Sequence, residues 1–309
     1  MELGFASTTD EITAGQDLTG TVALVTGASS GLGRETARAL AAVGARVILA
    51  GRNDDKLAAA ASRITDNAPK ATVEVADLDL TSLAQVRHFA EEFLAANDRL
   101  HLLINNAGVM ATPFEHTADG FELQFGTNHL GHFLLTCLLA PALLRDPPAR
   151  IVNLSSGGHL ASDILWDDPN FERGGYDPFI AYGQSKTANI LFTVELERRL
   201  SGRGVHAYAV HPGLVGTALG RYMTPEVMAQ LMEKAKQGGG MPTRKSLEQG
   251  AATSVWAATA PGLEAIGGSY LADCQVSDHY AAWAVDPDAA ARLWALSEEL
   301  VGQQFSLAS

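Results

Sequence analysis

The sequence predicts a single doubly wound α/β domain, in which a mostly or wholly parallel sheet carries helices on both faces. Short apolar runs of β-prone residues alternate along the chain with longer stretches of helical period. The expected strands are apolar along their whole length, which is typical of parallel strands covered on both faces. No internal repeat, low-complexity tract or charged linker divides the 309 residues, so one domain is expected.

The first part of the chain repeats one unit, a β-prone apolar run followed by a longer segment of helical period. Three such units in succession predict parallel strands joined by helices. The expected strand and helix pairs are, in order, Val22–Thr26 with Glu35–Val43, Arg46–Ala50 with Asp54–Thr65, and Ala71–Val75 with Ser82–Ala96.

The alternation continues through the middle of the chain. Further strands are expected at Leu100–Asn105, Arg150–Ser155 and Val205–Val210. A long helical region covers Thr117–Leu144, either continuous or broken near Gly126, and the last expected helix is Ala181–Leu200.

The domain is expected to span residues 20–302, with an N-terminal extension at 1–19 and a C-terminal tail at 303–309. Two segments inside it do not follow the alternation. Residues 157–179 form a long connection between a strand and a helix, and residues 214–246 contain a methionine-rich stretch and three consecutive glycines at 238–240. Both segments are expected to approach the substrate.

Composition and charge exclude several classes of function. Hydrophobic residues make up 47% of the chain and charged residues 18%, which is the profile of a folded globular protein and not of a disordered one. The net charge of −13 disfavours binding to nucleic acid or anionic lipid. Cys137 and Cys274 are too few for a disulfide framework, and each lies in an apolar stretch where a buried free thiol is expected.

No targeting or membrane segment is expected. Met1 to Thr19 has no basic cluster followed by an apolar run, so it does not read as a signal or transit peptide. The most apolar segment, Phe133–Leu144, is shorter than the ~20 residues that span a bilayer, and it contains Pro141. A cytoplasmic location without membrane attachment is the expectation.

A glycine-rich turn connects the first strand to the first helix. The segment reads Thr-Gly-Ala-Ser-Ser-Gly-Leu-Gly over residues 26–33. Gly27 allows the sharp exit from the strand, Gly31 lets the backbone approach a pyrophosphate, and Gly33 lets the helix pack on the strand. Phosphates would then lie at the positive end of the helix. This position, between strand and helix, predicts a dinucleotide site of the Rossmann type.

The end of the second strand indicates which dinucleotide is preferred. A site selective for NAD usually places Asp or Glu there to bind the adenosine ribose, but this chain has Gly51-Arg52-Asn53. Arg52 offers a guanidinium to a 2′-phosphate, and Arg34 could add a second positive charge. NADP(H) is therefore expected to be preferred over NAD(H).

Polar residues also follow the fourth and fifth strands. Asn105 and Asn106 end one strand, Ser155 and Ser156 end the next, and these strand ends gather at one edge of a parallel sheet. Tyr182 and Lys186 are four residues apart and share a helical face, which places an ammonium near a phenol. Lowering a phenol pKa from ~10 to near 7 requires about 4 kcal/mol, which the lysine and an oxidised nicotinamide together could supply.

These residues resemble the short-chain dehydrogenase/reductase family over nearly the whole chain. The resemblance rests on the glycine turn, Asn105-Asn106-Ala107-Gly108, Asn128, Ser156, Tyr182 with Lys186, and His211-Pro212-Gly213, in that order. Finer features are similar to the retinol dehydrogenase and WW-domain oxidoreductase branch: Asp79-Leu80 before Ser82-Leu83, the run Asn-His-Leu-Gly-His-Phe over 128–133, and the wide gap between Ser156 and Tyr182.

The resemblance implies a role for each of four catalytic residues. Tyr182 would be the acid/base, Lys186 would lower its pKa and hold the nicotinamide ribose, Ser156 would orient the carbonyl oxygen, and Asn128 would position a proton-relay water. Asp79 and Leu80 would contact adenine, Asn106 the adenosine side, and Val215 and Thr217 the carboxamide. The full set expected to bind cofactor is Gly27, Ser29, Ser30, Gly31, Leu32, Gly33, Arg52, Asp79, Leu80, Asn106, Ala107, Gly108, Tyr182, Lys186, Pro212, Gly213, Val215 and Thr217.

No metal site is expected. His129 and His132 share a helical face, but the nearby sequence supplies no third ligand. Asp163, Asp167 and Asp168 lie in the irregular segment 157–179, where solvated carboxylates are the simpler interpretation.

The sequence therefore predicts an NADP(H)-dependent oxidoreductase that interconverts an alcohol and its carbonyl. Two alternatives stay open: an NAD-dependent alcohol dehydrogenase, and a non-catalytic dinucleotide-binding regulator, which the complete catalytic set disfavours. A bulky apolar substrate is expected from the large apolar residues of the two irregular segments, Trp166, Phe171, Tyr176, Phe179, Met223, Met228, Met232 and Met241. By analogy with the family, a homo-oligomer is expected to form through the helices at Thr117–Leu144 and Ala181–Leu200.

Overall fold

The structure is a computed structural model, and it describes residues 3–223 and 243–306. The strands are β1 Val22–Thr26, β2 Arg46–Gly51, β3 Thr72–Asp77, β4 Leu102–Asn105, β5 Ala149–Leu154, β6 Val205–His211, β7 Leu214–Val215, β8 Arg244–Lys245, β9 Tyr270–Ala272 and β10 Gln275–Val276. The α-helices are α1 Thr9–Thr13, α2 Gly31–Ala42, α3 Asp54–Asn67, α4 Leu83–Ala96, α5 Leu123–Phe125, α6 Gly131–Leu143, α7 Pro178–Leu200, α9 Leu247–Thr259 and α10 Pro287–Leu300.

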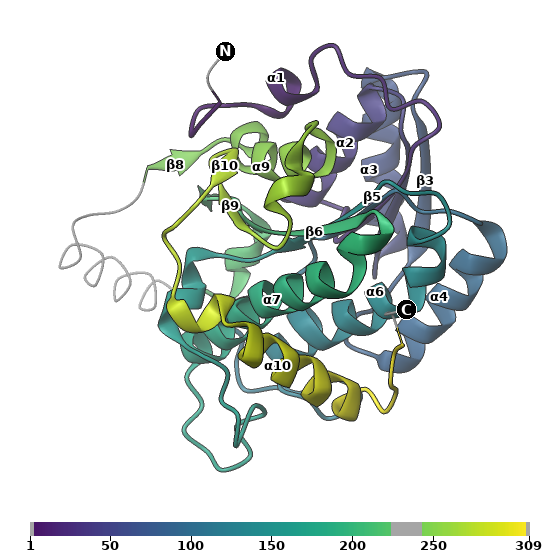
Figure 1. The fold of residues 1–309 in the computed structure, drawn as a ribbon. Helices are drawn as coiled ribbons and strands as arrows, with labels where there is room; N and C mark the ends of the chain where they lie inside the picture. The colour runs from purple at the N-terminus through teal and green to yellow at the C-terminus, as the bar shows by residue number, and fades with distance from the viewer. Residues whose placement is uncertain (1–2, 224–242, 307–309) are drawn as a thin grey trace.

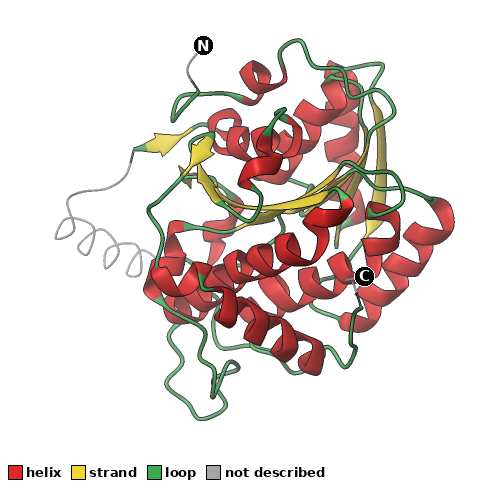
Figure 2. Cartoon of the chain, in the orientation of Figure 1, coloured by secondary structure: helices red, strands yellow, loops and turns green. Residues whose placement is uncertain are grey.

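Within the described residues, eight strands form one sheet in the order β10-β9-β6-β5-β4-β1-β2-β3. Every pairing is parallel except that of β10 with β9. Helices cover both faces of this sheet (Figures 1 and 2): α4, α6, α7 and α10 pack on one face, and α1, α2, α3 and α9 on the other. The mostly parallel, doubly wound α/β fold predicted from the sequence is confirmed.

The strand order reverses beside β1, which pairs with β2 on one side and with β4 on the other. In open α/β sheets, ligands bind at the carboxyl ends of the strands at such a switch point. The chain therefore has a crevice between the ends of β1 and β4, where the glycine turn follows β1.

The six strands expected from the sequence are present to within about two residues, but some helices differ from the expectation. Helix α2 begins at Gly31, four residues before the expected start, because the glycine turn itself forms its first turn. The region 117–144 is not one helix. Residues 117–122 are not helical, and helix begins only at Leu123. From there α5, a π-helical turn at Gly126–Leu130 and α6 follow one another, so the irregularity near Gly126 is a widening of the helix and not a break.

The β3 edge of the sheet departs from the expectation that every strand is buried on both faces. Its residues are exposed or only half-buried, and Val75 is 45% exposed. β3 is the last strand of the sheet and pairs with β2 on one side, and its sequence includes three polar residues, Thr72, Glu74 and Asp77.

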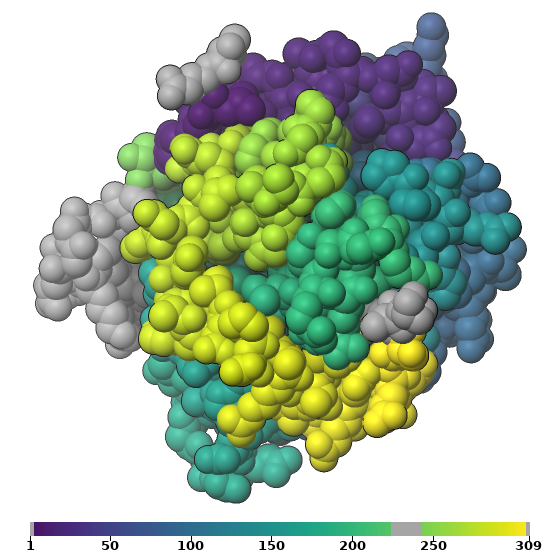
Figure 3. All heavy atoms as spheres, in the orientation of Figure 1, coloured from purple at the N-terminus to yellow at the C-terminus, as the bar shows by residue number. Residues whose placement is uncertain are grey.

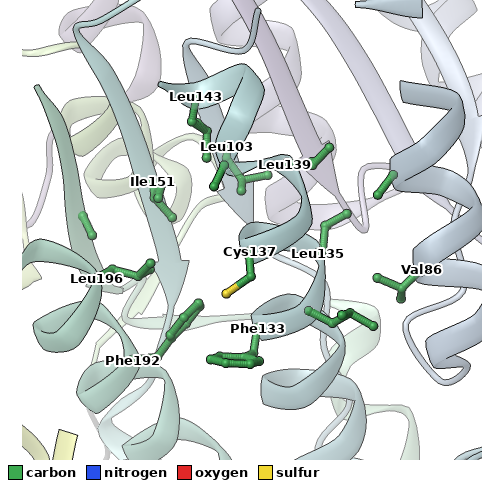
Figure 4. Close-up of a cluster of buried hydrophobic side chains, with 14 of the residues drawn as sticks. Val86, Leu103, Phe133, Leu135, Cys137, Leu139, Leu143, Ile151, Phe192 and Leu196 are labelled. Carbon is green, nitrogen blue, oxygen red and sulfur yellow. The ribbon is translucent and has the colours of Figure 1, made fainter. Parts of the chain in front are cut away.

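The core below the sheet is built from α4, α6 and α7 against β4 and β5. Phe133 and Cys137 of α6 meet Phe192 and Leu196 of α7 in a cluster whose side chains are buried (Figure 4). Both cysteines are buried free thiols, as expected. Because α6 is apolar around nearly its whole circumference, it lies between the sheet and its neighbours, not at the surface.

Helix α10 covers part of the surface of α6 and α7. The Trp294 ring packs on Phe133, with centroids 5.0 Å apart, and the Arg199 guanidinium lies 4.1 Å from the Trp294 ring centre. Phe305 packs on the same Phe133 ring, and the yellow C-terminal residues form a band across the lower part of the molecule (Figure 3). The homo-oligomer stays a prediction, but the chain's own C-terminal helix covers part of the surface on which it was based.

The expected N-terminal extension packs on the domain. Ile12 of α1 is buried, and the Thr9 hydroxyl donates to Glu35 of α2 at 2.5 Å. Arg38 binds both Glu35, at 2.6 Å, and Asp10, at 2.7 Å. Residues 3–19 therefore form part of the layer above the sheet. In the described ranges, no helix has the length and apolar character needed to cross a membrane.

Candidate active site

A cleft of about 400 Å³ opens at the switch point, above the carboxyl ends of β1, β2 and β4. Most of the residues expected to bind the cofactor line it, from the glycine turn to the segment after β4. Those residues are Gly27, Ser29, Ser30, Gly31, Leu32, Gly33, Arg52, Asp79, Leu80, Asn106, Ala107, Gly108 and Thr217. The cleft does not include Pro212, Gly213, Val215, Tyr182 or Lys186.

The glycine turn leaves no room for side chains. Gly27 has a φ of +65°, and a Cβ there would lie 2.8 Å from Cα of Ala107. A Cβ at Gly33 would lie 2.6 Å from the Gly27 carbonyl oxygen. Glycine is therefore required for the turn to lie against the end of β4, and its backbone forms one wall of the cleft.

Thr26 connects the end of β1 to the segment after β4. Its hydroxyl oxygen accepts hydrogen bonds from the Asn106 and Ala107 N–H groups, at 2.9 and 3.0 Å. The Asn106 amide nitrogen donates back to the Thr26 carbonyl at 2.8 Å. Asn106 lines the cleft as expected, but its side-chain donor is already used to hold the two strand ends together.

Cationic side chains lie at the β2 end of the cleft. Arg52 and Lys56 both line it, while Arg34, expected from the sequence as a second positive charge, does not. The Arg52 guanidinium lies 3.9 Å from the Asp79 carboxylate, and its side chain is 56% exposed. Asp79 also accepts from the Thr81 N–H and hydroxyl, which orients it.

Sequence reasoning did not identify Lys56 and Arg221 as residues that line the cleft. Lys56 lies in the first turn of α3, and its N–H donates to the Asn53 side chain that caps this helix. The Asn53 cap fixes where α3 begins. The position of Lys56, four residues after Arg52 and in the first turn of this helix, could therefore have indicated from the sequence that Lys56 lies near the cleft. Arg221 lies in a 3-10 turn at Ala218–Tyr222, within the segment expected to approach the substrate, and no local sequence pattern identifies it.

The two serines after β5 have different surroundings. Ser155 is buried, and its hydroxyl donates to the Lys186 carbonyl at 2.9 Å. Ser156 caps a 3-10 turn at Gly157–Ala161, and its hydroxyl oxygen accepts from the Gly158 N–H at 3.1 Å. A Cβ on Gly158 would lie 2.8 Å from Cε1 of Tyr182, so this turn is packed directly on the Tyr182 ring. Ser156, not Ser155, is the serine beside Tyr182.

Helix α7 presents Tyr182 and Lys186 to the same edge of the sheet. The Lys186 ammonium lies 5.6 Å from the Tyr182 ring centre and donates to the Leu154 carbonyl at 3.0 Å. A Cβ on Gly108, at the inner end of the cleft, would lie 3.7 Å from this ammonium nitrogen. The lysine is therefore close both to the inner end of the cleft and to the tyrosine.

Burial controls the protonation of this pair. It raises the pKa of Tyr182 to about 12, with the Ser156 hydroxyl acting in the opposite direction. It lowers the pKa of Lys186 to about 8. The sequence argument expected a phenol pKa near 7, but within the chain alone the low-polarity surroundings dominate. Tyr182 is consequently a protonated phenol at neutral pH.

Asn128 lies in the π-helical turn, and its side chain is fully buried. Its amide exchanges two hydrogen bonds with the Val109 backbone and donates a third to the Ser185 hydroxyl at 2.9 Å. The His132 Nδ1 lies 3.0 Å from the Asn128 carbonyl oxygen. The side chain thus connects the segment after β4 to α7, and it has little freedom for the water-positioning role that the resemblance implies.

Most aromatic residues of segment 157–179 pack the segment onto the domain. Trp166 packs against the large core with the Arg292 guanidinium 4.2 Å from its ring centre, and Phe171 is buried. The Tyr176 hydroxyl donates to the Thr112 carbonyl at 3.0 Å. These contacts pack the segment onto the domain, and Trp166 and Phe171 also line a second hollow of about 410 Å³, together with Leu165, Ile180, Asp167 and Asp168. Met228, Met232, Met241 and the glycine run lie outside the described residues.

The acidic residues of the same segment hold its turns. Asp168 accepts from the Glu172 and Arg173 N–H groups, and Asp163 accepts from the Ile164 N–H. His129 contacts Ser297, and His132 contacts Thr26. Across residues 3–223 and 243–306, no three His, Cys, Asp or Glu side chains are grouped as a metal ion would require.

Comparison with known sequences places the chain in a family. The family model of short chain dehydrogenases matches residues 21–227. Retinol dehydrogenase 12 of Mus musculus is 46% identical over 296 residues, covering 95% of this chain and 90% of the relative. The WW domain-containing oxidoreductase of Danio rerio is 44% identical over 302 residues, covering 95% of this chain and 71% of the relative.

Solved structures agree. An uncharacterised protein from Mycobacterium paratuberculosis is 36% identical with a TM-score of 0.76, covering 97% of this chain and 99% of that one. A gluconate 5-dehydrogenase from Burkholderia cenocepacia, in complex with NADP and tartrate, is 25% identical with a TM-score of 0.63, covering 85% and 96%. The resemblance found in the sequence is confirmed: the chain belongs to the short-chain dehydrogenase/reductase family, in the branch of the retinol dehydrogenases and the WW domain-containing oxidoreductase.

Proposed function

We propose that the chain is an NADP(H)-dependent oxidoreductase that interconverts a bulky apolar alcohol and its carbonyl, with Tyr182 as the acid/base. The observation that carries this proposal is the placement of Tyr182, Lys186 and Ser156 beside the inner end of a glycine-walled cleft. A proton donor, a cation and a hydroxyl then face the position where the reactive end of a dinucleotide would lie.

The cleft fits a dinucleotide. Its wall has no side chains at Gly27 and Gly33, and it runs from Arg52 to Gly108, beyond which Lys186 and Tyr182 follow. The start of α2 supplies backbone N–H groups and the positive end of a helix for phosphates. When bound, a nicotinamide cofactor supplies or accepts the hydride of the reaction.

The residues of the chain manage the charge on the substrate oxygen. During carbonyl reduction, negative charge develops on this oxygen, and the Tyr182 O–H donates a proton to it. The Ser156 hydroxyl donates a hydrogen bond to the same oxygen, and the Lys186 ammonium stabilises the phenolate that remains. Alcohol oxidation reverses these steps, with the Tyr182 phenolate accepting the proton.

The preference for NADP(H) rests on the cations at the β2 end of the cleft. Arg52 and Lys56 line this end, and no carboxylate occupies the position after β2 where NAD-selective sites place one. The ion pair between Arg52 and Asp79 is long, at 3.9 Å, and exposed to solvent. A 2′-phosphate could therefore take the place of the Asp79 carboxylate as the partner of Arg52.

For wild type, we expect NADPH to bind more tightly than NADH by roughly 1–3 kcal/mol, or about 5-fold to 150-fold in Kd. Arg52→Asp should reverse this preference, because the carboxylate repels the phosphate and accepts from the ribose hydroxyls. Fluorescence titration with both reduced cofactors measures it. Arg34→Ala is the matched control, since Arg34 does not line the cleft, and it should leave the ratio unchanged. Equal wild-type dissociation constants would favour the NAD-dependent alternative.

An apolar substrate is supported by the surface next to Ser156. Leu160 and Tyr280 are 40% and 39% exposed, and they adjoin His159 and Ala281, which hydrogen-bond to each other. Large apolar side chains thus remain exposed beside the catalytic turn. The name of the retinol dehydrogenase relatives states that their substrate is retinol, an apolar alcohol. For this chain the proposal covers apolar alcohols as a class and does not extend to retinol itself.

A ketone series tests both the reaction and the substrate class. With NADPH, we expect kcat/KM to rise from acetone to cyclohexanone to 2-decalone, because each buried methylene adds ~0.8 kcal/mol, or about 4-fold, until the site is full. Initial rates of NADPH oxidation provide the measurement. A flat series, or a preference for pyruvate, would contradict the apolar class while leaving the reaction intact. No turnover of any member, in either direction, would favour the non-catalytic alternative.

A further inference from the structure

The peptide group between Ser156 and Gly157 is held at both ends by histidine side chains. His159 Nδ1 lies 2.6 Å from the Ser156 carbonyl oxygen, and the Gly157 N–H donates to His211 Nδ1 at 3.2 Å. The residue before Ser156 is also anchored, since the Ser155 N–H donates to the Val210 carbonyl at 2.8 Å. The backbone on either side of the catalytic serine is therefore fixed.

The hydrogen bonds determine where each imidazole carries its proton. The Ala281 N–H donates to His159 Nε2 at 3.2 Å, so this nitrogen is an acceptor and Nδ1 donates to Ser156. In His211, Nδ1 is the acceptor, so its proton is on Nε2. His159 is buried and His211 half-buried, and loss of contact with water lowers the pKa of each, that of His211 to about 4, so both rings are neutral. Each histidine thus has one defined tautomer.

The two rings are supported by the C-terminal part of the chain. The Tyr270 ring of β9 packs edge-on against His159, with centroids 5.0 Å apart, and lies parallel to His211 at 6.4 Å. Tyr270 is 2% exposed. Tyr270 and Ala281 both lie beyond residues 21–227, the part that the family model matches. Groups from the C-terminal part of the chain therefore support the two histidines that hold the serine peptide.

We propose that His159 and His211 are positioning residues that hold the Ser156–Gly157 peptide and thereby orient the Ser156 hydroxyl toward Tyr182. The proposal rests on the function proposed above. Neither histidine is placed to touch the reacting atoms. They act through the peptide, because its plane sets the direction in which the Ser156 side chain leaves the backbone.

The site has little tolerance for movement of this peptide. The turn that follows Ser156 packs on the Tyr182 ring, where a Cβ on Gly158 would already lie within 2.9 Å of two ring atoms. A rotation of the Ser156–Gly157 peptide would move the hydroxyl relative to the phenol or press the turn into the ring. Such a movement is expected to reduce the rate of the chemical step more than cofactor binding, because Ser156 is not among the residues that line the cleft.

The test uses substitutions that keep or remove the hydrogen bond at the δ position. In His159→Asn, the side-chain amide can donate to the Ser156 carbonyl, and in His211→Asn the amide oxygen can accept from the Gly157 N–H. His159→Leu and His211→Leu have similar bulk but make neither bond. We expect the leucine variants to lower kcat about 10-fold or more, with NADPH Kd within about 2-fold of wild type, and the asparagine variants to recover most of the loss.

Combining these variants with Ser156→Ala separates positioning from a general structural effect. We expect His159→Leu to have no further effect on kcat once the Ser156 hydroxyl is absent, since its effect passes through that hydroxyl. The substrate is the ketone with the highest kcat/KM in the series above. Circular dichroism and NADPH titration check that each variant is folded, and the asparagine variants keep the test usable where a leucine variant does not fold.

Two results would overturn the positioning role while leaving the proposed function in place. One is wild-type kcat in both leucine variants. The other is a loss in the Ser156→Ala background as large as that in wild type. If Ser156→Ala itself has wild-type kcat, the serine's part in the proposed function fails, and the positioning role fails with it.

Discussion

Tyr182→Phe is expected to lower kcat by about 10²–10⁴-fold, because the ring remains while the transferable proton is removed. The fold and NADPH affinity should be retained, since the phenol lies beyond the glycine-walled cleft. Burial raises the pKa of Tyr182 to about 12, so the phenol is protonated at neutral pH. The substitution therefore removes a general acid and not only a hydrogen bond. Steady-state rates with a ketone and NADPH, together with cofactor titration, provide the measurement.

Tyr208→Phe is the matched control for this substitution. Tyr208 is also fully buried, and in the described part of the chain its hydroxyl has no hydrogen-bond partner. Removing an unpartnered buried hydroxyl should leave kcat unchanged and should not destabilise the fold. Near-wild-type turnover in Tyr182→Phe would show that the assigned acid/base is wrong.

The stability of the protein is expected to fall steeply between pH 6.5 and pH 4. Burial lowers the pKa of His129 to about 3 and those of His132 and His211 to about 4. In this window the unfolded state binds protons that the folded state excludes, so the free energy of unfolding decreases as the pH falls. Each histidine contributes about 1.4 kcal/mol per pH unit.

One buried carboxyl opposes this trend. Burial raises the pKa of Glu122, so its folded form takes up a proton earlier and gains stability as the pH falls. Glu122 offsets part of the slope that the histidines produce, and the net slope near pH 5 is expected to exceed one proton, or about 1.4 kcal/mol per pH unit. Urea unfolding at half-unit pH steps measures it.

Substitution of His129 measures how much this one histidine contributes to the pH dependence of stability. His129→Phe keeps the packing against Phe125, Phe133 and Phe192 and should reduce the slope by about one proton. His88 is 64% exposed at its side chain, so His88→Gln should leave the slope unchanged. A wild-type slope below one proton across this window would contradict the neutral state of these histidines in the folded protein.

Much of the fold follows from local pattern. The strands β1 to β6 were predicted to within about two residues; for β1, β2 and β4 to β6 the reason is that a buried parallel strand is an apolar run whatever packs against it, whereas β3 is an exposed edge strand with β-prone residues. The parts that local pattern did not predict are held by distant contacts. Strands β9 and β10 are three and two residues long, and α10 is held by Trp294 on Phe133 and Phe192.

The candidate site divides in the same way. The sequence placed the glycine turn, Arg52, and Tyr182 with Lys186 at one edge of the sheet, because strand ends meet there in any doubly wound fold. It did not predict that Lys56 and not Arg34 lines the cleft, since that depends on where the capped first turn of α3 lies. It left open whether Trp166, Phe171 and Tyr176 line a substrate pocket or pack the long segment onto the domain, and the structure shows that they make packing contacts.

The sequence by itself determined the fold class, the family and the residue types available for hydride chemistry, because periodicity, glycine placement and motif order are local properties. Only the tertiary structure decided how those residues are held and charged. Burial raises the pKa of Tyr182 instead of lowering it, and the Asn128 amide is fully engaged. The serine peptide lies between His159 and His211, 52 residues apart (211 − 159). Desolvation and hydrogen bonding depend on surroundings assembled from distant segments, and no local pattern encodes them.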